Sequence, residues 1–229
     1  MHIELDYRNK NVLVVGGTSG INLGIAKGFA KAGAKVAVAS RSESKVNSAC
    51  EELTQTGAIA TLGFCADVRD YDAVKDGVEQ ISSAWGALDV VVSGAAGNFP
   101  ATLNKMSSNA FRSVIEIDLV GTFHVMKAIY PHLNKSGSSV INISAPQSFV
   151  PVFSQSHVSA AKAGVDMITR SLALEWGAEG IRINSIVPGP IAGTEGMQRL
   201  APTEAMTNQV IKAVPSKRMG QTEDIANAC

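Results

Sequence analysis

One short stretch of this sequence limits the possible folds more than any other. Residues 11–15 form an uninterrupted apolar run, which ends in a glycine-rich turn at residues 16–20 and continues into a helical pattern over residues 21–32. A continuous run of β-branched residues predicts a strand that is buried on both faces. The stretch therefore predicts a strand, a tight turn and a helix, the unit from which parallel α/β sheets are built.

The same alternation repeats along the chain. Further strands are expected at residues 35–39, 59–66, 88–92, 139–143 and 181–187. The helices between them are expected at residues 43–53, 71–85, 107–133 and 156–176. Apolar strands joined by helices form a parallel sheet with right-handed crossovers and helices on both faces. We predict a single doubly wound Rossmann domain of the α/β class over residues 1–229.

Composition excludes several classes of partner. The chain has 229 residues with 20 Lys+Arg and 20 Asp+Glu, so its formal net charge is zero. An even charge balance argues against nucleic acid and against a polybasic contact with a membrane surface. No apolar run approaches the ~20 residues of a membrane helix. We therefore expect neither nucleic acid nor a membrane as a partner.

The N-terminal residues and the cysteines favour a cytoplasmic protein. Residues 1–10 carry four Asp, Glu, Lys or Arg side chains where a secretory segment would be apolar. The three cysteines are odd in number and far apart, which suggests neither a disulfide framework nor a metal site. They are Cys50, Cys65 and Cys229.

The expected helix at residues 156–176 has two apolar faces. A helix that is apolar nearly all round needs cover on both sides, so the second face predicts a homo-oligomer. The alternative is that this face packs inside the same subunit. The core-facing stripe contains Ala161, Val165, Ile168 and Leu172, and the second face contains Gly164, Met167, Ser171 and Leu174.

The glycine turn and the end of the second strand together suggest a dinucleotide. Glycines let the backbone approach a phosphate, and the following helix N-terminus attracts an anion. The spacing is Gly-x-x-x-Gly, so the turn alone could equally be a tight connection. After the second strand stands Arg41, where NAD binders carry an acid. An arginine there, reinforced by Lys45, suits a 2′-phosphate and favours NADP, although it could also be a solvated surface residue.

From residue 11 to residue 225 the chain resembles the short-chain dehydrogenase/reductase family. The resemblance rests on the glycine turn, on Asp67-Val68, on Ala95-Ala-Gly97, on Lys162 and on Pro188-Gly189. Lys162 matches the family's active-site lysine, which bonds the nicotinamide ribose. The resemblance implies an NADP(H) site formed by Gly16, Gly17, Thr18, Ser19, Gly20, Ile21, Arg41, Asp67, Val68, Lys162, Pro188, Gly189, Ile191 and Thr194.

Four positions depart from the family pattern. Val158 stands where the catalytic tyrosine is usual, Ala145 where the serine is usual and Asp118 where the helix asparagine is usual. Asn22 replaces the third glycine of the turn, and we expect little distortion because asparagine tolerates positive φ. Valine has no proton to give, so ordinary ketone reduction lacks its acid.

One branch of the family shows the same departures, the 2,4-dienoyl-CoA reductases of the peroxisomal type. The resemblance to this branch lies in residues 95–99, 108–111, 117–123 and 188–196, with His157 five positions before Lys162. It implies NADPH-dependent reduction of an unsaturated acyl-CoA. Its proton is expected from a water held by Asp118 and Lys162, because the positive charge of Lys162 would lower the pKa of Asp118 and weaken a direct acid role. Asp118 could instead be a helix-packing carboxylate.

The branch also implies a substrate site. Arg69 and Arg199 stand where it places cations for the CoA phosphates, and Phe99 would line the acyl or pantetheine path with the turn of Ser107, Ser108 and Asn109. Each arginine could equally be a surface residue, and the turn could be plain loop packing. His157 could take part beside the site, although a lone histidine is more often structural.

Two other functions remain open from the sequence. One is an NADP-binding protein that has lost its chemistry, and the other is a reductase of a different activated alkene or carbonyl. Family members are usually homotetramers that use a final strand at an interface. The sequence ends in a helical pattern at Cys229 without that strand, so we expect a weakened assembly if 229 residues are the full length.

Overall fold

The computed structural model describes residues 5–229 and contains one parallel sheet. The order of the six strands across the sheet is β3-β2-β1-β4-β5-β6, and every neighbouring pair is parallel. Their bounds are β1 Asn11–Val15, β2 Lys35–Ser40, β3 Ala60–Cys65, β4 Val90–Ser93, β5 Ser139–Ile143 and β6 Arg182–Ile186. The predicted α/β fold class is confirmed.

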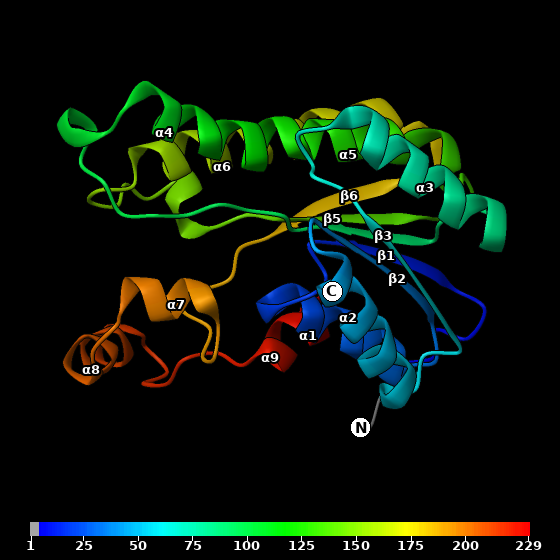
Figure 1. Cartoon of the computed structure of the whole chain (residues 1–229), viewed down its shortest axis with the longest axis horizontal. Helices are drawn as coiled ribbons and strands as arrows, with labels where there is room; N and C mark the ends of the chain where they lie inside the picture. The colour runs from blue at the N-terminus through cyan, green and yellow to red at the C-terminus, as the bar shows by residue number, and fades with distance from the viewer. Residues whose placement is uncertain (1–4) are drawn as a thin grey trace.

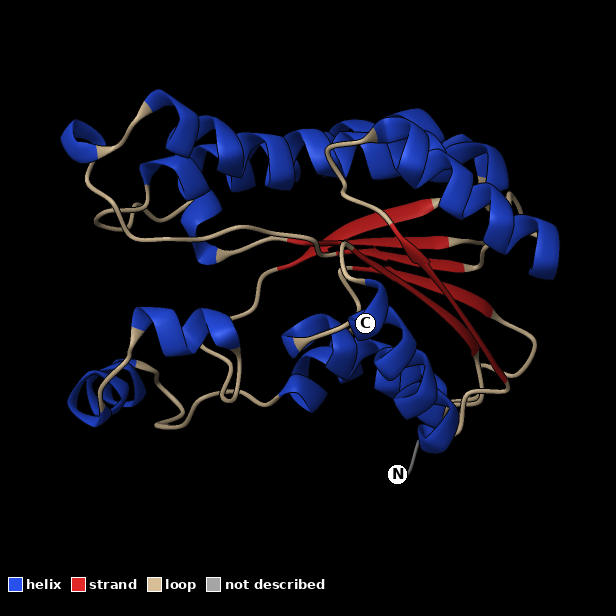
Figure 2. Ribbon diagram, in the orientation of Figure 1, coloured by secondary structure: helices blue, strands red, loops and turns tan. Residues whose placement is uncertain are grey.

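Helices cover both faces of the sheet, as Figures 1 and 2 show. One layer contains α3, α4, α5 and α6, and the other contains α1, α2 and α9, while α7 and α8 lie beyond the end of the sheet to which β6 leads. Their bounds are α1 Gly20–Lys31, α2 Glu43–Thr56, α3 Tyr71–Trp85, α4 Ser108–Val114, α5 Gly121–Ile129, α6 Ser156–Trp176, α7 Glu195–Leu200, α8 Glu204–Ala213 and α9 Thr222–Ala228.

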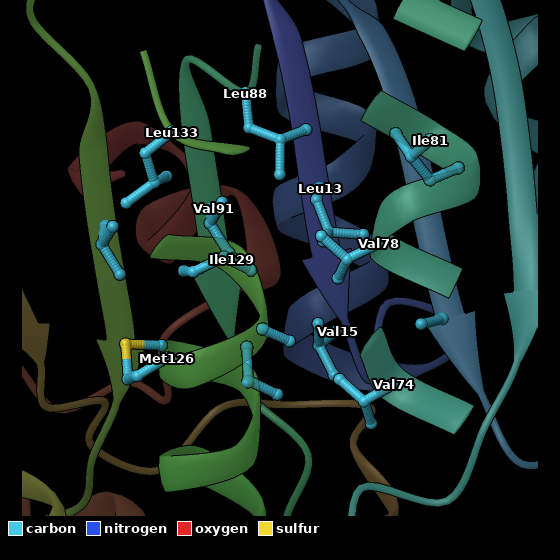
Figure 3. Packing of buried hydrophobic residues seen from close by; sticks show 14 of the residues in the cluster. Leu13, Val15, Val74, Val78, Ile81, Leu88, Val91, Met126, Ile129 and Leu133 are labelled. Carbon is cyan, nitrogen blue, oxygen red and sulfur yellow. The ribbon is translucent and has the colours of Figure 1, made fainter. Parts of the chain in front are cut away.

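The hydrophobic core has two halves, one on each face of the sheet. Leu13 and Val15 point into the half formed with α3 and α5, where Val78 and Ile129 pack (Figure 3). Alternate residues of the same strand, Val12 and Val14 among them, belong to the half under α1 and α2. Successive side chains of a strand point to opposite faces, so a strand covered on both sides is apolar throughout. This explains the continuous apolar run at residues 11–15.

Short polar residues fix where several helices begin. The Asp70 carboxylate accepts a hydrogen bond from the Ala73 amide at 3.1 Å, and the Ser107 hydroxyl accepts one from the Ala110 amide at 3.1 Å. Such caps satisfy amides that have no partner within the helix and stabilise it by about 1 kcal/mol. The predicted bounds of α3, α6 and β5 agree with the structure.

The long helix predicted at residues 107–133 is the largest local difference. The chain forms α4, a π-helical segment at Ile115–Val120, α5 and a 3₁₀ turn at Tyr130–His132. A π turn carries one more residue than an α turn, and the apolar periodicity of the sequence does not reveal it. Pro131 in the 3₁₀ turn lacks the amide that would continue the helix.

The second apolar face of α6 is divided between the interior and the surface. A Cβ at Gly164 would come 2.8 Å from the Leu119 side chain, so this part packs within the subunit. Met167 and Leu174 are 56% and 86% exposed. A homo-oligomer therefore stays a prediction for this face.

Two expected absences concern membranes and metals. None of the helices within residues 5–229 combines the length and apolarity needed to cross a bilayer. The same residues contain no cluster of three or more His, Cys, Asp or Glu side chains arranged to hold a metal ion.

Candidate active site

The strand order places a candidate site at the carboxyl ends of β1 and β4. The chain runs outward from β1 to β2 and β3 on one side, and from β4 to β5 and β6 on the other. The loops after β1 and β4 therefore leave the sheet in opposite directions and open a crevice between them. Doubly wound sheets bind their ligands at this switch point.

The glycine turn after β1 forms a cradle open to a phosphate. Gly16 has a φ of +79°, and a Cβ there would come 2.9 Å from the Ala95 amide nitrogen. Gly20 has a φ of +55°, and a Cβ there would meet nothing nearer than Thr194 at 3.9 Å. The first turn of α1 has no acidic residue, and its N-cap Ser19 makes no side-chain cap. Free amides at the start of a 12-residue helix fit a phosphate anion.

Asn22 ties this turn to the loop after β4. Its side-chain Nδ2 donates to the Gly94 carbonyl at 2.8 Å, and a Cβ at Gly94 would lie 2.4 Å from the same nitrogen. Asn22 lies inside α1 and has no positive φ. We expected Asn22 to cause little distortion because asparagine tolerates positive φ. This reason is wrong, because the position is helical and the Asn22 side chain instead links α1 to the loop after β4.

Three of the predicted residues gather after β2 and β3. Arg69 donates from Nε and Nη2 to the Asp67 carboxylate at 3.0 and 2.6 Å. The Arg69 guanidinium lowers the pKa of Asp67, and the charge of the exposed Arg41 acts in the same direction. Arg41 and Arg69 thus share one acidic neighbour, and a negatively charged group at this edge would meet two guanidinium groups.

Asp118 and Lys162 form a buried ion pair. Their residues are 1% and 6% exposed, and the Lys162 ammonium lies 3.3 Å from Asp118 Oδ2. Asp118 Oδ1 accepts from the Gly97 amide at 2.7 Å, while Lys162 Nζ donates to the Ile143 carbonyl at 2.9 Å. The π-helical segment carries Asp118, and π turns are frequent at functional sites.

The direction of the Asp118 pKa corrects one expectation. Burial raises the pKa of Asp118, and this effect exceeds the opposing effects of Lys162 and the Gly97 amide. We expected the charge of Lys162 to lower the pKa of Asp118 overall. This expectation is wrong, because removing the carboxylate from water raises the pKa more than the nearby ammonium lowers it. A raised pKa makes this carboxyl group a better proton carrier than an exposed aspartate.

Val158 occupies an apolar position. It is 3% exposed and packs with Val114 and Ala161, and Phe99 lies against the same small cluster. The side chain at this position therefore contributes packing and offers no proton.

Two cavities lie near the predicted substrate residues. The first has a volume of about 210 Å³ and is bordered by residues 96–100, Glu195, Gly196, Arg199 and Leu200. Arg199 pairs with Glu195, and its Nη1 approaches the Asn98 carbonyl at 3.5 Å. The second has about 330 Å³ and includes Ser107 and Ser108 but not Asn109. The structure thus brings Phe99 and Arg199 to one cavity and leaves the residue 107–109 turn at another.

The segment after β6 returns to the glycine turn. Thr194 and Ile191 are buried, and Thr194 lies beside Gly20. Pro188 is buried and Gly189 is exposed. This segment therefore lies beside the glycine turn.

Sequence reasoning missed several partners in the site because they are backbone groups. The Gly97 amide and the Ile143 carbonyl hold the buried pair, and any residue type could supply them. The Asn22 contact had a partial signal, since an amide side chain replaced a glycine.

Known proteins resemble this chain along most of its length. Residues 10–205 match the family described as short chain dehydrogenase. A peroxisomal 2,4-dienoyl-CoA reductase of Arabidopsis thaliana, described as (3E)-enoyl-CoA-producing, is 41% identical and aligns with 96% of this chain and 77% of its own. A probable 2,4-dienoyl-CoA reductase of Bacillus subtilis, described as (2E)-enoyl-CoA-producing, is 37% identical over 95% of this chain and 86% of its own.

A solved structure supports the same relation. A short chain dehydrogenase from Bacillus anthracis has a TM-score of 0.84 and 35% identity, covering 96% of this chain and 87% of that one.

The Arabidopsis relative is described as peroxisomal, so the expectation of a cytoplasmic protein gains no support from it. The family's Rossmann fold implies a nicotinamide cofactor. The fold, the site at the switch point and these similarities lead to one conclusion: the chain belongs to the short-chain dehydrogenase family of oxidoreductases.

Proposed function

We propose that this chain catalyses the NADPH-dependent reduction of a 2,4-dienoyl-CoA to a 3-enoyl-CoA. The observation that carries the proposal is the buried Asp118–Lys162 pair beside an apolar Val158. This arrangement lacks the phenol that protonates an alkoxide but keeps a carboxylate and an ammonium able to hold a water. The names of the relatives support the same substrate class.

Arg41 supports NADPH as the cofactor. It is exposed near the end of β2, and its charge already acts on the nearby Asp67. A guanidinium can contact a 2′-phosphate through two charge-assisted hydrogen bonds. Asp67-Val68 would lie at the adenine, the glycine turn at the pyrophosphate and Lys162 at the nicotinamide ribose.

The bound reduced nicotinamide supplies a hydride. The residues of this chain must then handle the charge that develops when the δ-carbon of the dienoyl thioester accepts it. That charge moves to the thioester oxygen as a dienolate, which is more stable than the alkoxide of a reduced ketone. Oriented N–H donors and the Lys162 ammonium would stabilise it in a site closed to bulk water.

Asp118 and Lys162 would hold the water that completes the reaction. Asp118 is fixed through the Gly97 amide and Lys162 through the Ile143 carbonyl, so neither side chain needs to reorganise. The dienolate carries much of its charge at the α-carbon, and a proton placed there gives the 3-enoyl product, as in the name of the Arabidopsis relative.

Phe99 and Arg199 would contact the substrate. Both border the cavity of about 210 Å³, where the half-buried phenyl ring would lie along the acyl or pantetheine chain. Arg199 at the mouth, and Arg69 near the adenine side, would face the CoA phosphates. The turn at residues 107–109 would lie farther along the same path.

The test is NADPH oxidation with three substrates: a 2,4-dienoyl-CoA, a 2-enoyl-CoA and a 3-ketoacyl-CoA. The proposal predicts turnover of the dienoyl substrate and a 3-enoyl product by mass spectrometry and NMR. Turnover of the 3-ketoacyl substrate alone would replace it with a carbonyl reductase. NADPH binding without turnover of any of the three substrates would favour a non-catalytic cofactor-binding protein.

A further inference from the structure

His157 is a buried side chain whose hydrogen-bonding capacity the fold leaves largely unused. It lies in the first turn of α6 and is 0% exposed. Neither ring nitrogen makes a hydrogen bond of ordinary geometry with any other residue in the described range, 5–229. Buried polar groups nearly always bond to protein or to ordered water. The ring is therefore placed to bind something other than the protein's own side chains.

The neighbours of His157 belong to the candidate active site. Its ring packs against the Phe99 ring in a tilted arrangement, with centroids 4.5 Å apart and planes inclined by 39°. Phe99 borders the cavity of about 210 Å³, so the histidine lies behind the cavity wall. This packing holds the plane of the imidazole.

The surroundings of His157 favour the neutral form of its ring. Burial lowers the pKa of His157, while a weak hydrogen-bonding contact with the Phe99 backbone and the negative charge of Asp118 act in the opposite direction with less effect. A neutral imidazole has one nitrogen that donates a hydrogen bond and one that accepts. It can therefore bind a water molecule in either orientation without changing its own charge.

Asp118 presents a second unused atom. Its Oδ2 lies 3.3 Å from Lys162 Nζ but makes no hydrogen bond of ordinary geometry within residues 5–229. The segments after β4 and β5 contain further buried side-chain oxygens that make no hydrogen bond within residues 5–229. They are Asn98 Oδ1, Thr102 Oγ1, Ser144 Oγ, Gln147 Oε1 and Ser148 Oγ. Buried waters occupy sites that offer two to four polar partners, and the His157 ring and Asp118, whose charge acts on that ring, supply such partners.

We propose that His157 is a positioning residue of the reductase, and that its ring and Asp118 together hold the water that protonates the substrate. The proposal rests on the proposed function. It also accounts for the adjacent Val158, because the valine cannot orient a water. The family pattern has a hydrogen-bonding tyrosine at position 158. In this chain the hydrogen-bonding side chain at the start of α6 would instead stand at position 157.

The proton step balances without a change in His157. One O–H bond of the water breaks and a C–H bond forms at the α-carbon, which neutralises the dienolate. The remaining hydroxide takes a proton from the Lys162 ammonium, and Lys162 regains a proton from solvent after the product leaves. His157 keeps its own proton throughout and determines only where the water lies.

The experiment compares His157→Leu with His157→Gln in the full chain. Glutamine keeps one donor and one acceptor, whereas leucine fills the space without either. We expect His157→Leu to lower kcat about 10-fold or more, with an increased solvent deuterium isotope effect and an unchanged Kd for NADPH. We expect His157→Gln to recover most of kcat. His132→Gln is the matched control. His132 accepts a backbone hydrogen bond from Leu88, just before β4 begins, so it lies at the amino ends of the strands, away from the candidate site.

The outcomes separate this inference from the proposed function. A wild-type protein that does not reduce the dienoyl substrate overturns both. An active wild type with unchanged kcat and isotope effect in His157→Leu overturns the role of His157 alone. Loss of kcat in both variants, with a lowered Tm and no change in isotope effect, would show a structural role. If His157→Leu does not fold, the isotope effect and kcat of His157→Gln and His157→Asn decide the question.

Discussion

Lys162 Nζ lies 3.3 Å from Asp118 Oδ2 in the interior, and each side chain is held by a backbone group: Asp118 by the Gly97 amide in the loop after β4, and Lys162 by the Ile143 carbonyl at the end of β5. Because both side chains are almost fully buried, the pair must be maintained as a unit. Removing one partner leaves a charge without compensation in a poorly polar environment. Burial of the pair, which makes it useful for chemistry, therefore also makes both partners necessary for stability.

Lys162→Met should therefore destabilise the fold by about 3–5 kcal/mol, because Asp118 is left buried and unpaired. Urea unfolding at neutral pH measures this loss. Lys75→Met, which breaks the exposed pair with Glu79, is the control and should cost about 0–1 kcal/mol. The double variant Asp118→Leu with Lys162→Met should recover much of the loss, and equal losses for the single and double variants would contradict this interpretation.

Arg41→Ala should reduce the affinity for NADPH about 10- to 100-fold, since a charge-assisted contact contributes about 1.5–3 kcal/mol. The Kd for NADH, which lacks the 2′-phosphate, should stay within about twofold. Fluorescence titration with both cofactors measures the two values. Arg170→Ala, at an exposed arginine of α6, serves as the control. An equal loss for NADPH and NADH would remove Arg41 from phosphate recognition.

Val158→Tyr restores the tyrosine that the family pattern would have at this position. The valine is 3% exposed among Val114, Ala161 and Phe99, so the larger ring overpacks the cluster. We expect a loss of about 1–3 kcal/mol in unfolding free energy and no gain of 3-ketoacyl-CoA reduction. Thermal unfolding and NADPH oxidation check the two outcomes. A stable variant that reduces the ketone would show that one residue separates the two activities.

Asp89 should control part of the stability at low pH. Its carboxylate accepts from the Asn11 amide at 3.0 Å and from Asn134 at 3.0 Å. Although burial opposes them, these bonds and Lys10 lower the pKa of Asp89, so the unfolded chain binds its proton first as the pH falls. The stabilisation is present above the unfolded pKa of ~3.9 and is lost as pH falls through the folded value.

Unfolding free energies at a series of pH values test this for Asp89→Asn. The difference between wild type and variant should be largest near neutral pH and should shrink below about pH 4. A difference that stays constant across the series would assign the effect of Asp89 to packing.

Periodicity in the sequence predicts most of the fold. The bounds of α3, α6 and β5 agree with prediction because each carries a clear apolar pattern between polar or glycine-rich breaks. α7 and α8 were not predicted, since they are short and expose most of their surface. A signal was present: Thr194-Glu195 and Thr203-Glu204 each place a capping hydroxyl before an acidic first residue.

The candidate site was predictable in its residue types but not in its electrostatics. The family resemblance implied that Lys162 lies close to Asp118, and the structure confirms this proximity. The direction of the Asp118 pKa depends on how much solvent the surrounding loops exclude, and that balance exists only in the folded chain.

The most direct measurement is a single turnover of wild type and Asp118→Asn with saturating NADPH and a 2,4-dienoyl-CoA. Asparagine keeps the size of the side chain and an acceptor for the Gly97 amide, so NADPH binding should be retained. We predict that reduction slows about 100-fold or more, because the water loses its carboxylate partner. Equal rates of 3-enoyl-CoA formation in the two proteins would contradict the role of the Asp118–Lys162 pair in delivering the proton.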